Sequence, residues 1–218
     1  MVIGNISSCV KIWLTGSTKI TGNANAPVIT ASGTAITGSK TIGAVPTITI
    51  PDFDATAFKN AAIANGQYFT ATKSYSGSTD ITPNGGIVYS EGDINISGSG
   101  RMIGCFIANG AIKISGSGDQ IQVNNYPAFV TLTGKNDQSG SGKTHGLIYG
   151  GKSGSLSFDR SGSGDVTGQI ICKGDFDASG SWSALTYENS TPVPPATGGG
   201  GGSGGSSGDI VGVIAWQK

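Results

Sequence analysis

Five aspartates are the residues of this sequence whose type and position could do chemistry, and they stand close to repeated turns: Asp93, Asp119, Asp165, Asp175 and Asp177. Two or three carboxylates within roughly 5–10 Å on one face could cleave a glycosidic bond, and a cage of carboxylates could hold calcium. Asp175 and Asp177 are two positions apart, so on a strand they would point to the same side and flank Phe176. We interpret this pair as a solvated strand face, and a carbohydrate-cleaving groove stays the alternative.

A Gly-Lys-Thr sequence within SGSGKTHG, residues 139–146, suggests a phosphate-binding loop. That motif needs a glycine where this chain has Asp137, and it needs a helix after the loop, whereas an aromatic, glycine-rich strand follows here. His145 is the single histidine, and no Gly-x-Ser-x-Gly turn between a strand and a helix accompanies it. We predict that Lys143 is a surface residue at a turn and that His145 faces solvent from a loop. The sequence assigns no catalytic, cofactor-binding or metal-binding residue, and we expect neither an enzyme nor a cofactor.

The composition favours an all-β protein with many tight turns. Glycine occupies 38 positions, each of which would cost up to about 1 kcal/mol in a helix interior, and a charged fraction of 12% is low for a disordered chain. The formal net charge of zero provides no basic face for nucleic acid, and no apolar run is long enough for a membrane span. Cys9, Cys105 and Cys172 allow at most one disulfide, and we interpret Cys105 and Cys172, in apolar runs, as buried free thiols.

Ser-Gly-Ser-Gly corners divide the chain into units of 18 to 24 residues. They begin at Ser97, Ser115, Ser139 and Ser161, and a variant follows at residues 178–182. Short stretches with alternating apolar residues precede the corners, which indicates strands buried on one side: Ile94 and Ile96, Ile112 and Ile114, Val130 and Leu132, Leu156 and Phe158, Phe176 and Ala178. An earlier apolar stretch of each unit follows Gly86, Gly104, Gly146 and Gly168.

Each unit therefore holds three short strands and three turns, which is the outline of one coil. A single coil cannot bury its apolar face, but coils stacked about 4.8 Å apart can do so, with like residues lying on like. Glycine suits the corners because it accepts positive φ and close backbone packing. We predict an all-β fold, a parallel β-solenoid (β-helix) that is right-handed by analogy, with one short helical insertion and a C-terminal strand.

The helical insertion is expected at about residues 51–67. A candidate helix runs from Asp54 to Asn65, where Asp52 or Asp54 can cap its start and Gly66 can end it. Its apolar side consists of Phe58, Ala61 and Ala62. We expect this insertion to pack against the solenoid or to cover one of its ends.

The remaining boundaries follow from changes in composition. The solenoid domain is assigned to residues 1–190, and residues 11–43 have the strand and glycine-corner pattern of about two coils. Residues 191–208 form a Pro/Gly/Ser-rich linker of low complexity. Residues 209–218 are too apolar to leave exposed, so we expect a terminal strand that packs back on the solenoid.

The order of these parts resembles a known family. Gly-cornered strands come first, then IPDFDATAFKNAAIANGQYF, then ITPNGGIVYSEGDINISGSG, further SGSG coils and a Trp-containing C-terminal strand. This order is similar to the C-terminal β-solenoid domain of PilX-like type IV pilus assembly proteins and, more loosely, to the polymer-forming bactofilins. The resemblance implies an extracellular or cell-surface location and supplies no catalytic residues. Family members begin with a prepilin leader and a hydrophobic helix, and the first residues here are too polar for a targeting segment.

We therefore expect a non-catalytic structural protein: a rigid rod at the cell surface or associated with a type IV pilus, able to self-assemble into filaments. Its expected partners are itself or pilin-like proteins, which it would bind through solenoid ends or edges. The alternative is a carbohydrate-binding or carbohydrate-cleaving β-helix protein, in which tyrosines form a strip on the surface. Tyr89 and Tyr149 occupy matching positions in their coils and are expected to share one column, for which core or interface packing is the simpler explanation.

Overall fold

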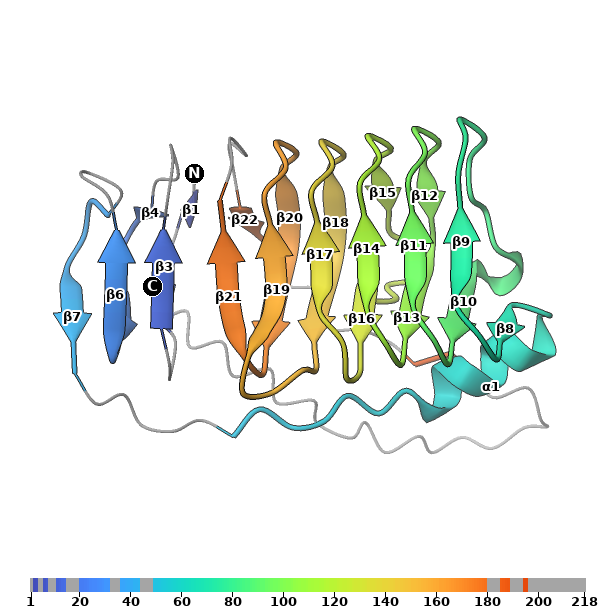
Figure 1. The fold of residues 1–218 in the computed structure, drawn as a ribbon, viewed down its shortest axis with the longest axis horizontal. Coiled ribbons are helices and arrows are strands. Elements are labelled where there is room, and N and C mark those ends of the chain that lie inside the picture. The colour runs from blue at the N-terminus through green and yellow to red at the C-terminus, as the bar shows by residue number, and fades with distance from the viewer. Residues whose placement is uncertain are drawn as a thin grey trace.

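The computed structural model describes residues 2–3, 6–7, 11–14, 20–31, 36–43, 49–179, 185–188 and 194–195. Within these residues the chain winds into stacked coils, whose short strands lie side by side along a rod (Figure 1). Neighbouring strands of the stack run parallel to one another. The prediction of a parallel β-solenoid is confirmed.

Two long sheets enclose the interior of the rod. The first sheet holds nine strands, in the spatial order β8 (Tyr68–Phe69), β10 (Ile87–Ser90), β13 (Cys105–Ala108), β16 (Phe129–Thr131), β18 (Thr144–Gly150), β20 (Val166–Cys172), β22 (Leu185–Tyr187), β1 (Val2–Ile3) and β4 (Ile20–Thr21). The second sheet holds eight, in the order β9 (Lys73–Tyr75), β11 (Ile94–Ile96), β14 (Ile112–Ile114), β17 (Asn136–Gln138), β19 (Leu156–Arg160), β21 (Asp175–Ala178), β3 (Lys11–Leu14) and β6 (Val28–Ala31).

Shorter pieces complete the coils. Strands β12 (Met102–Ile103) and β15 (Gln120–Ile121) pair on the third side, and the 3-10 turn η1 (Asn84–Gly86) precedes β10. Three further strands form a small sheet: β2 (Ile6–Ser7), β5 (Ala24–Ala26) and β7 (Lys40–Ile42). The outline of three short strands per coil is therefore present, although β18 and β20 each continue from the third side into the first sheet.

The register confirms most of the expected columns and corrects one. Ile94 pairs with Ile112, as the repeated pattern predicts. The assignment of Val130 and Leu132 to the strand before the Ser139 corner is wrong, because Val130 lies in β16 of the first sheet and pairs with Ile107. The strand before that corner is the polar β17, whose Asn136 lies on Ile112.

The polar strand β17, in the place where an apolar strand was expected, changes the chemistry of the interior. The buried core beside β11 and β14 is aliphatic and aromatic, whereas β17 and β19 bring the polar side chains of Asn136, Gln138 and Arg160 inside, all of them buried. Arg160 donates to the carbonyl oxygens of Gly142 and Gly164 and to Oε1 of Gln138. Like residues therefore lie on like only in part of the stack.

The order of coils along the rod differs from their order in the sequence. The chain from β8 to β22, here called the main stack, proceeds coil by coil in one direction. The N-terminal coils, which are the described strands β1 to β7 of residues 2–43, do not precede β8 but lie beyond β21 and β22 (Figure 1). Strand β3 pairs with β21, so that Ile12 lies on Phe176 although 164 positions separate them in the sequence.

The predicted helix is present as α1 (Thr56–Ala64), and the backbone N–H of Thr56 donates to Oδ1 of Asp54 at 2.9 Å. Phe58 and Ala62 are buried, and the helix packs on β10 and β8 at one end of the rod. The helices of the described residues include none that is long and apolar enough to cross a membrane. The predicted strand at residues 209–218 and nearly all of the linker at 191–208 lie outside the described residues.

Candidate functional site

The aspartates near the turns fasten one coil to the next. Oδ1 of Asp93 accepts a hydrogen bond from the backbone N–H of Ala111 at 2.8 Å, and Oδ1 of Asp119 accepts one from Lys143 at the same distance. Both bonds satisfy backbone donors that the corner geometry leaves without a ladder partner. The third, Asp165, lies near Arg160, whose positive charge its carboxylate stabilises. These three acids are not gathered on one face.

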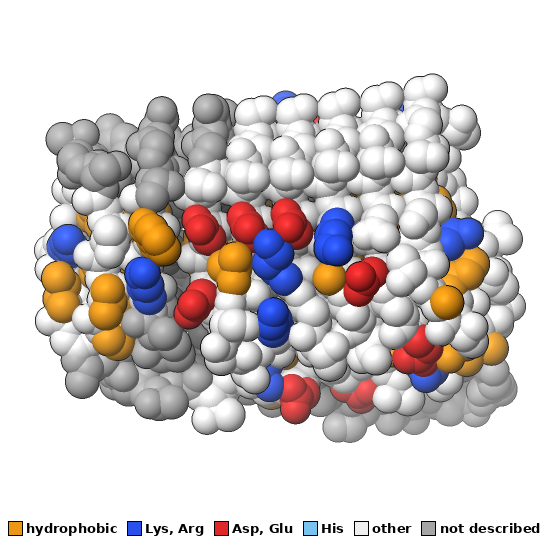
Figure 2. All heavy atoms as spheres, viewed as in Figure 1, with side chains coloured by type: hydrophobic (Ala, Val, Ile, Leu, Met, Phe, Trp, Pro, Cys, Tyr) orange, Lys and Arg blue, Asp and Glu red, His pale blue; other side chains and the backbone are white. Residues whose placement is uncertain are grey.

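A row of three aspartates crosses the outer face of the second sheet. Asp137, Asp159 and Asp177 pair in register on β17, β19 and β21, so their carboxylates occupy adjacent coils. Figure 2 shows this row of acidic side chains beside basic ones on the face of the rod. Nζ of Lys135 lies 2.8 Å from Asp137 and 2.9 Å from Asp159. We call these three aspartates the aspartate ladder.

The ladder was missed in the sequence, although a signal for it exists. Asp137, Asp159 and Asp177 each lie two positions before the first serine of a corner, and Lys113 holds the equivalent position one coil earlier. The alternation of apolar residues identifies only the inward side chains of these strands, so it does not predict what the outward column contains. Of the pair proposed from sequence, Asp177 belongs to the ladder, whereas Asp175 pairs with Leu156 beyond a register shift.

Asp177 is the ladder member with the least favourable surroundings. Partial burial raises the pKa of its carboxyl, the negative charge of Asp159 raises it further, and Lys135 and Lys11 lower it. Its pairing partner on the other side is Trp13, over whose ring Nζ of Lys11 lies at 3.9 Å. The ladder is therefore a place where like charges accumulate across coils and where one lysine bridges only two of the three.

Replacing Asp177 by asparagine is expected to stabilise the protein at neutral pH, because the amide keeps the shape and removes a charge that burial and Asp159 disfavour. The raised pKa means that the folded state binds this proton more tightly than the unfolded chain does. The wild-type penalty is thus present at neutral pH and disappears as the pH falls through the raised value toward 3.8. Urea unfolding at pH 7 and pH 4 should show the advantage of the Asp177→Asn variant shrinking on acidification.

The matched control for this prediction is Asp175→Asn, on the same strand but outside the ladder. Its effect on the free energy of unfolding should be smaller at pH 7. An advantage of Asp177→Asn that stays constant between the two pH values would contradict the electrostatic explanation.

Two shallow hollows lie beside the ladder and along the corners. One, of about 320 Å³, is lined by Asn95, Lys113, Asp137 and neighbouring residues. The other, of about 740 Å³, follows the stacked Ser-Gly-Ser corners from residue 77 to residue 141. The hollow along the corners is lined by glycine backbone and serine hydroxyls, which can hydrogen-bond polar ligands, whereas the hollow beside the ladder includes Ile96 and Ile114 and exposes more apolar than polar surface. The described residues include no group of three or more His, Cys, Asp or Glu that could hold a metal ion.

The other residues considered from the sequence lie in a strand, at a corner or in apolar surroundings. His145 does face solvent, but it lies in β18 rather than in a loop, and its Nε2 is 2.7 Å from Oε2 of Glu188. Lys143 is at a corner, and Thr144 starts a strand instead of a helix, which agrees with rejecting a phosphate loop. Cys105 and Cys172 are free thiols as expected, but only Cys105 is fully buried and Cys172 is half-buried. Burial raises the pKa of Cys105 well above its ordinary value and that of Cys172 to about 12, and Cys9 lies outside the described residues.

The expected tyrosine column exists, and it is covered. Tyr89 and Tyr149 lie in one column of the first sheet, separated by Ile107 and Val130. Both are 4% exposed, because α1 and residues 50–53 pack over this face and form a second apolar cluster outside the coils. Packing therefore accounts for them.

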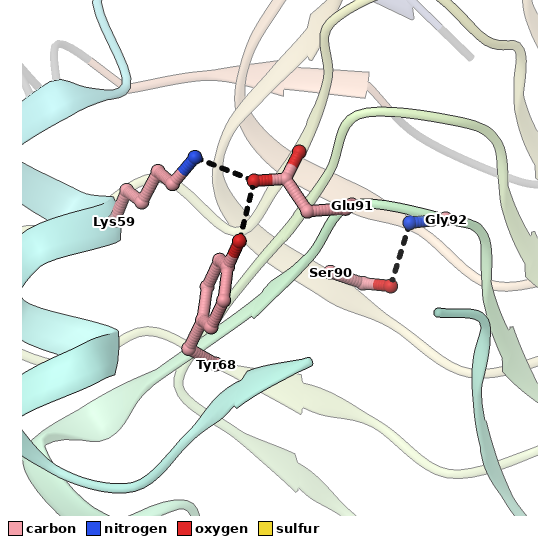
Figure 3. Close-up of polar contacts among 5 residues, drawn as sticks. All are labelled: Lys59, Tyr68, Ser90, Glu91 and Gly92. Atoms are coloured by element: carbon pink, nitrogen blue, oxygen red, sulfur yellow. Dashed lines mark hydrogen bonds and ion pairs between the residues drawn. The ribbon is translucent and has the colours of Figure 1, made fainter. Parts of the chain in front are cut away.

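Polar side chains join α1 to the outer face of the first sheet near one end of the rod. Nζ of Lys59 lies 2.5 Å from Oε1 of Glu91, to which the hydroxyl of Tyr68 also donates at 2.9 Å. The bond from Lys59 and the bond from Tyr68 hold the pKa of Glu91 below its ordinary value. Figure 3 shows Lys59 reaching from the helix toward Glu91, with Ser90 accepting from the backbone of Gly92 nearby. Three elements, α1, β8 and the turn after β10, are thereby joined.

The opposite end has a different character. Its outermost strands are β4, β6 and β7, and no helix of the described residues covers them (Figure 1). Val28 is 48% exposed and Ile42 is 61% exposed, while every residue of β7 is exposed. We call this the open end. Within the described part of the chain it offers unpaired strand edges and apolar side chains, which are the features of a surface that pairs with another chain.

The comparisons with known proteins supply no relative. No known protein family, no curated protein and no solved structure matches this chain.

Proposed function

We propose that the protein is a non-catalytic structural rod that joins other copies end to end at the cell surface or in association with a type IV pilus. The observation that carries this proposal is that the terminal strands of the stack have no strand partner on their outer edge among the described residues: β8 and β9 at one end, β4, β6 and β7 at the other. A stack of parallel coils grows wherever its last strand is unpaired. Elongation by a second copy is the simplest way to pair that edge.

The arrangement of side chains suits a load-bearing role. Corner aspartates bond to the next coil, Lys135 bridges two rungs of the ladder, and aromatic rings stack within columns, as Phe158 does on Phe176 with centroids 5.1 Å apart. Each of these contacts acts between neighbouring coils, so stability accumulates along the rod. The pilus and cell-surface location rests on the order of parts in the sequence, and it is tested by labelling intact cells of the source organism with an antibody against the rod.

Replacing Val28 and Ile42 together by lysine is expected to weaken end-to-end assembly, because two charges at the open end repel a second strand edge and remove apolar area. Sedimentation velocity and electron microscopy over a concentration series should show linear oligomers for the wild-type chain. The double variant should need about tenfold more protein to reach the same mean size, which corresponds to roughly 1.4 kcal/mol per junction.

Ile121→Lys provides the control, since Ile121 is 37% exposed on β15 at the side of the rod. It should assemble like the wild-type chain. A wild-type protein that stays a monodisperse monomer at high concentration would overturn the proposal, and so would equal effects of the end and side variants.

A further inference from the structure

The N-terminal coils contact the main stack at a junction between strands that are not consecutive in the sequence. Strand β3 pairs with β21, with Ile12 on Phe176, Trp13 on Asp177 and Leu14 on Ala178. The inward residues of this junction are buried: Ile12 and Leu14 are each 2% exposed and Ala178 is 1% exposed. The first sheet repeats the junction, where Val2 lies on Leu185. It has the same parallel pairing and buried apolar columns as the rest of the stack, but its two halves belong to distant parts of the chain.

The covalent connection between the halves is short for the distance that it covers. The N-terminal coils end at Gly43 beside the open end, and α1, which packs on β10 and β8 near the other end, begins at Thr56, which leaves residues 44–55 to join them. The eight strands of the second sheet are spaced about 4.8 Å apart, so they cover about 34 Å. Twelve residues reach about 40 Å at full extension, whereas a relaxed flexible segment of that length averages about 19 Å between its ends.

The described part of this connection packs on the outer face of the first sheet through Ile50, Phe53 and Ala55. The hydroxyl of Tyr149 donates to the carbonyl oxygen of Pro51 at 2.8 Å, and the ring of Phe53 lies 5.5 Å from that of Tyr149. Oδ1 of Asp52 is 2.5 Å from Nζ of Lys173, but the Asp52 side chain is 92% exposed, and exposed ion pairs contribute little. Twelve residues between two well-packed parts, which must cover most of the distance that their full length allows, are the arrangement that favours exchange between copies.

We infer that the N-terminal coils of one copy dock on β21 and β22 of a second copy, which links the rods head to tail by exchange. The acceptor surface is the same in both cases, so the buried contacts at the junction are the same within one chain and between two. The geometry of the connection differs. When the N-terminal coils sit on a neighbour, residues 44–55 no longer have to reach along the length of their own main stack.

This inference rests on the proposed function only in taking a second copy as the partner, because it uses the β21–β3 junction and not the open end. The test uses the full chain with Cys9→Ser as background. One preparation carries Trp13→Cys and another carries Asp177→Cys, which are register partners. Parallel neighbours have the Cα separation that a disulfide needs. The two preparations are unfolded together, refolded over a range of concentrations and oxidised.

Exchange predicts a disulfide-linked pair of chains whose yield rises with the refolding concentration. The chain that carries both substitutions, refolded when dilute, should instead form the bond within itself, which verifies the junction. The control pairs Trp13→Cys with Asn95→Cys, because Asn95 lies in the same outward column but four coils from Asp177. A linked yield no higher than that of this control would overturn the inference.

Two further variants separate this result from open-end assembly. Insertion of ten Gly and Ser residues after Gly43 relaxes the connection within one chain, and it should lower the linked yield about threefold or more. The Val28→Lys, Ile42→Lys variant should leave the linked yield unchanged, because those residues do not contribute to the β21–β3 junction. Loss of linkage in the open-end variant alone would assign the crosslink to end contact and overturn exchange.

Discussion

Replacing Gly140 by alanine is expected to lower the free energy of unfolding by about 3 kcal/mol or more, or to prevent folding. Gly140 belongs to the Ser-Gly-Ser-Gly corner that begins at Ser139, and a β-carbon there would overlap the carbonyl oxygen of Gly116 in the coil below. In turn, the backbone of Gly140 lies where a β-carbon on Gly162 would be. These are contacts of backbone with backbone, so no flexible side chain can move aside.

The coils cannot separate to make room, because hydrogen bonds on both sides of the corner set their spacing. The N–H groups of Ser139 and Gly140 both donate to the carbonyl oxygen of Ile114, at 2.9 Å and 3.1 Å. Urea unfolding followed by circular dichroism measures the effect. Gly43→Ala is the control, since a β-carbon at Gly43 meets nothing within 4 Å. A Gly140→Ala protein as stable as that control would contradict the packing of the corners.

Replacing Arg160 by methionine is expected to cost about 3 kcal/mol. Arg160 is 1% exposed, and its guanidinium donates to Gly142 at 2.9 Å, to Gly164 at 2.6 and 3.1 Å, and to Oε1 of Gln138. Burial lowers its pKa to about 10, which still leaves it charged at neutral pH. Methionine fills much of the volume but leaves these buried acceptors without donors.

A second substitution distinguishes lost hydrogen bonds from lost packing. Gln138 occupies the column position that Ile96 and Ile114 hold in earlier coils, so Gln138→Leu continues the aliphatic column. Added to Arg160→Met, it removes one of the stranded acceptors, and part of the lost stability should return in urea unfolding. Strictly additive losses from the two substitutions would show that Gln138 and Arg160 do not act together.

The local elements of the fold could be predicted because each leaves a regular mark in the sequence. Glycines close the corners at Gly98, Gly116, Gly140 and Gly162, where only a missing side chain lets two coils approach. Alternation identified β11 and β14, since their inward residues are isoleucines. It failed at β17, because the polar Asn136 and Gln138 point inward there; Nε2 of Gln138 donates to Oδ1 of Asn136 at 3.0 Å, while the buried Nδ2 of Asn136 has no hydrogen-bond partner among the described residues. Counting back from the corner serine would have found that strand.

The order of the coils could not be predicted in the same way. The strands of residues 11–43 have the period and the corner glycines of any other coil, and a parallel edge accepts any strand with a matching buried column. Their place was decided by which edge they meet, β21 rather than β9, and nothing in the local pattern distinguishes these edges. Of the two expectations for α1, packing against the solenoid is confirmed, because Phe58 and Ala62 are buried in an apolar cluster on the outer face of the first sheet.

The position of β3 on β21 has a consequence for how the protein is made. A ribosome produces the N-terminal coils first, while the residues that will receive them are the last of the rod to be synthesised. At about 5–20 residues per second, Phe176 follows Ile12 after about 8–30 seconds. During that interval the N-terminal strands have no β21 of their own chain to pair with. A finished rod on a neighbouring ribosome of the same messenger presents one. For the exchange that we infer, crowding of nascent chains should therefore favour docking on the copy translated ahead.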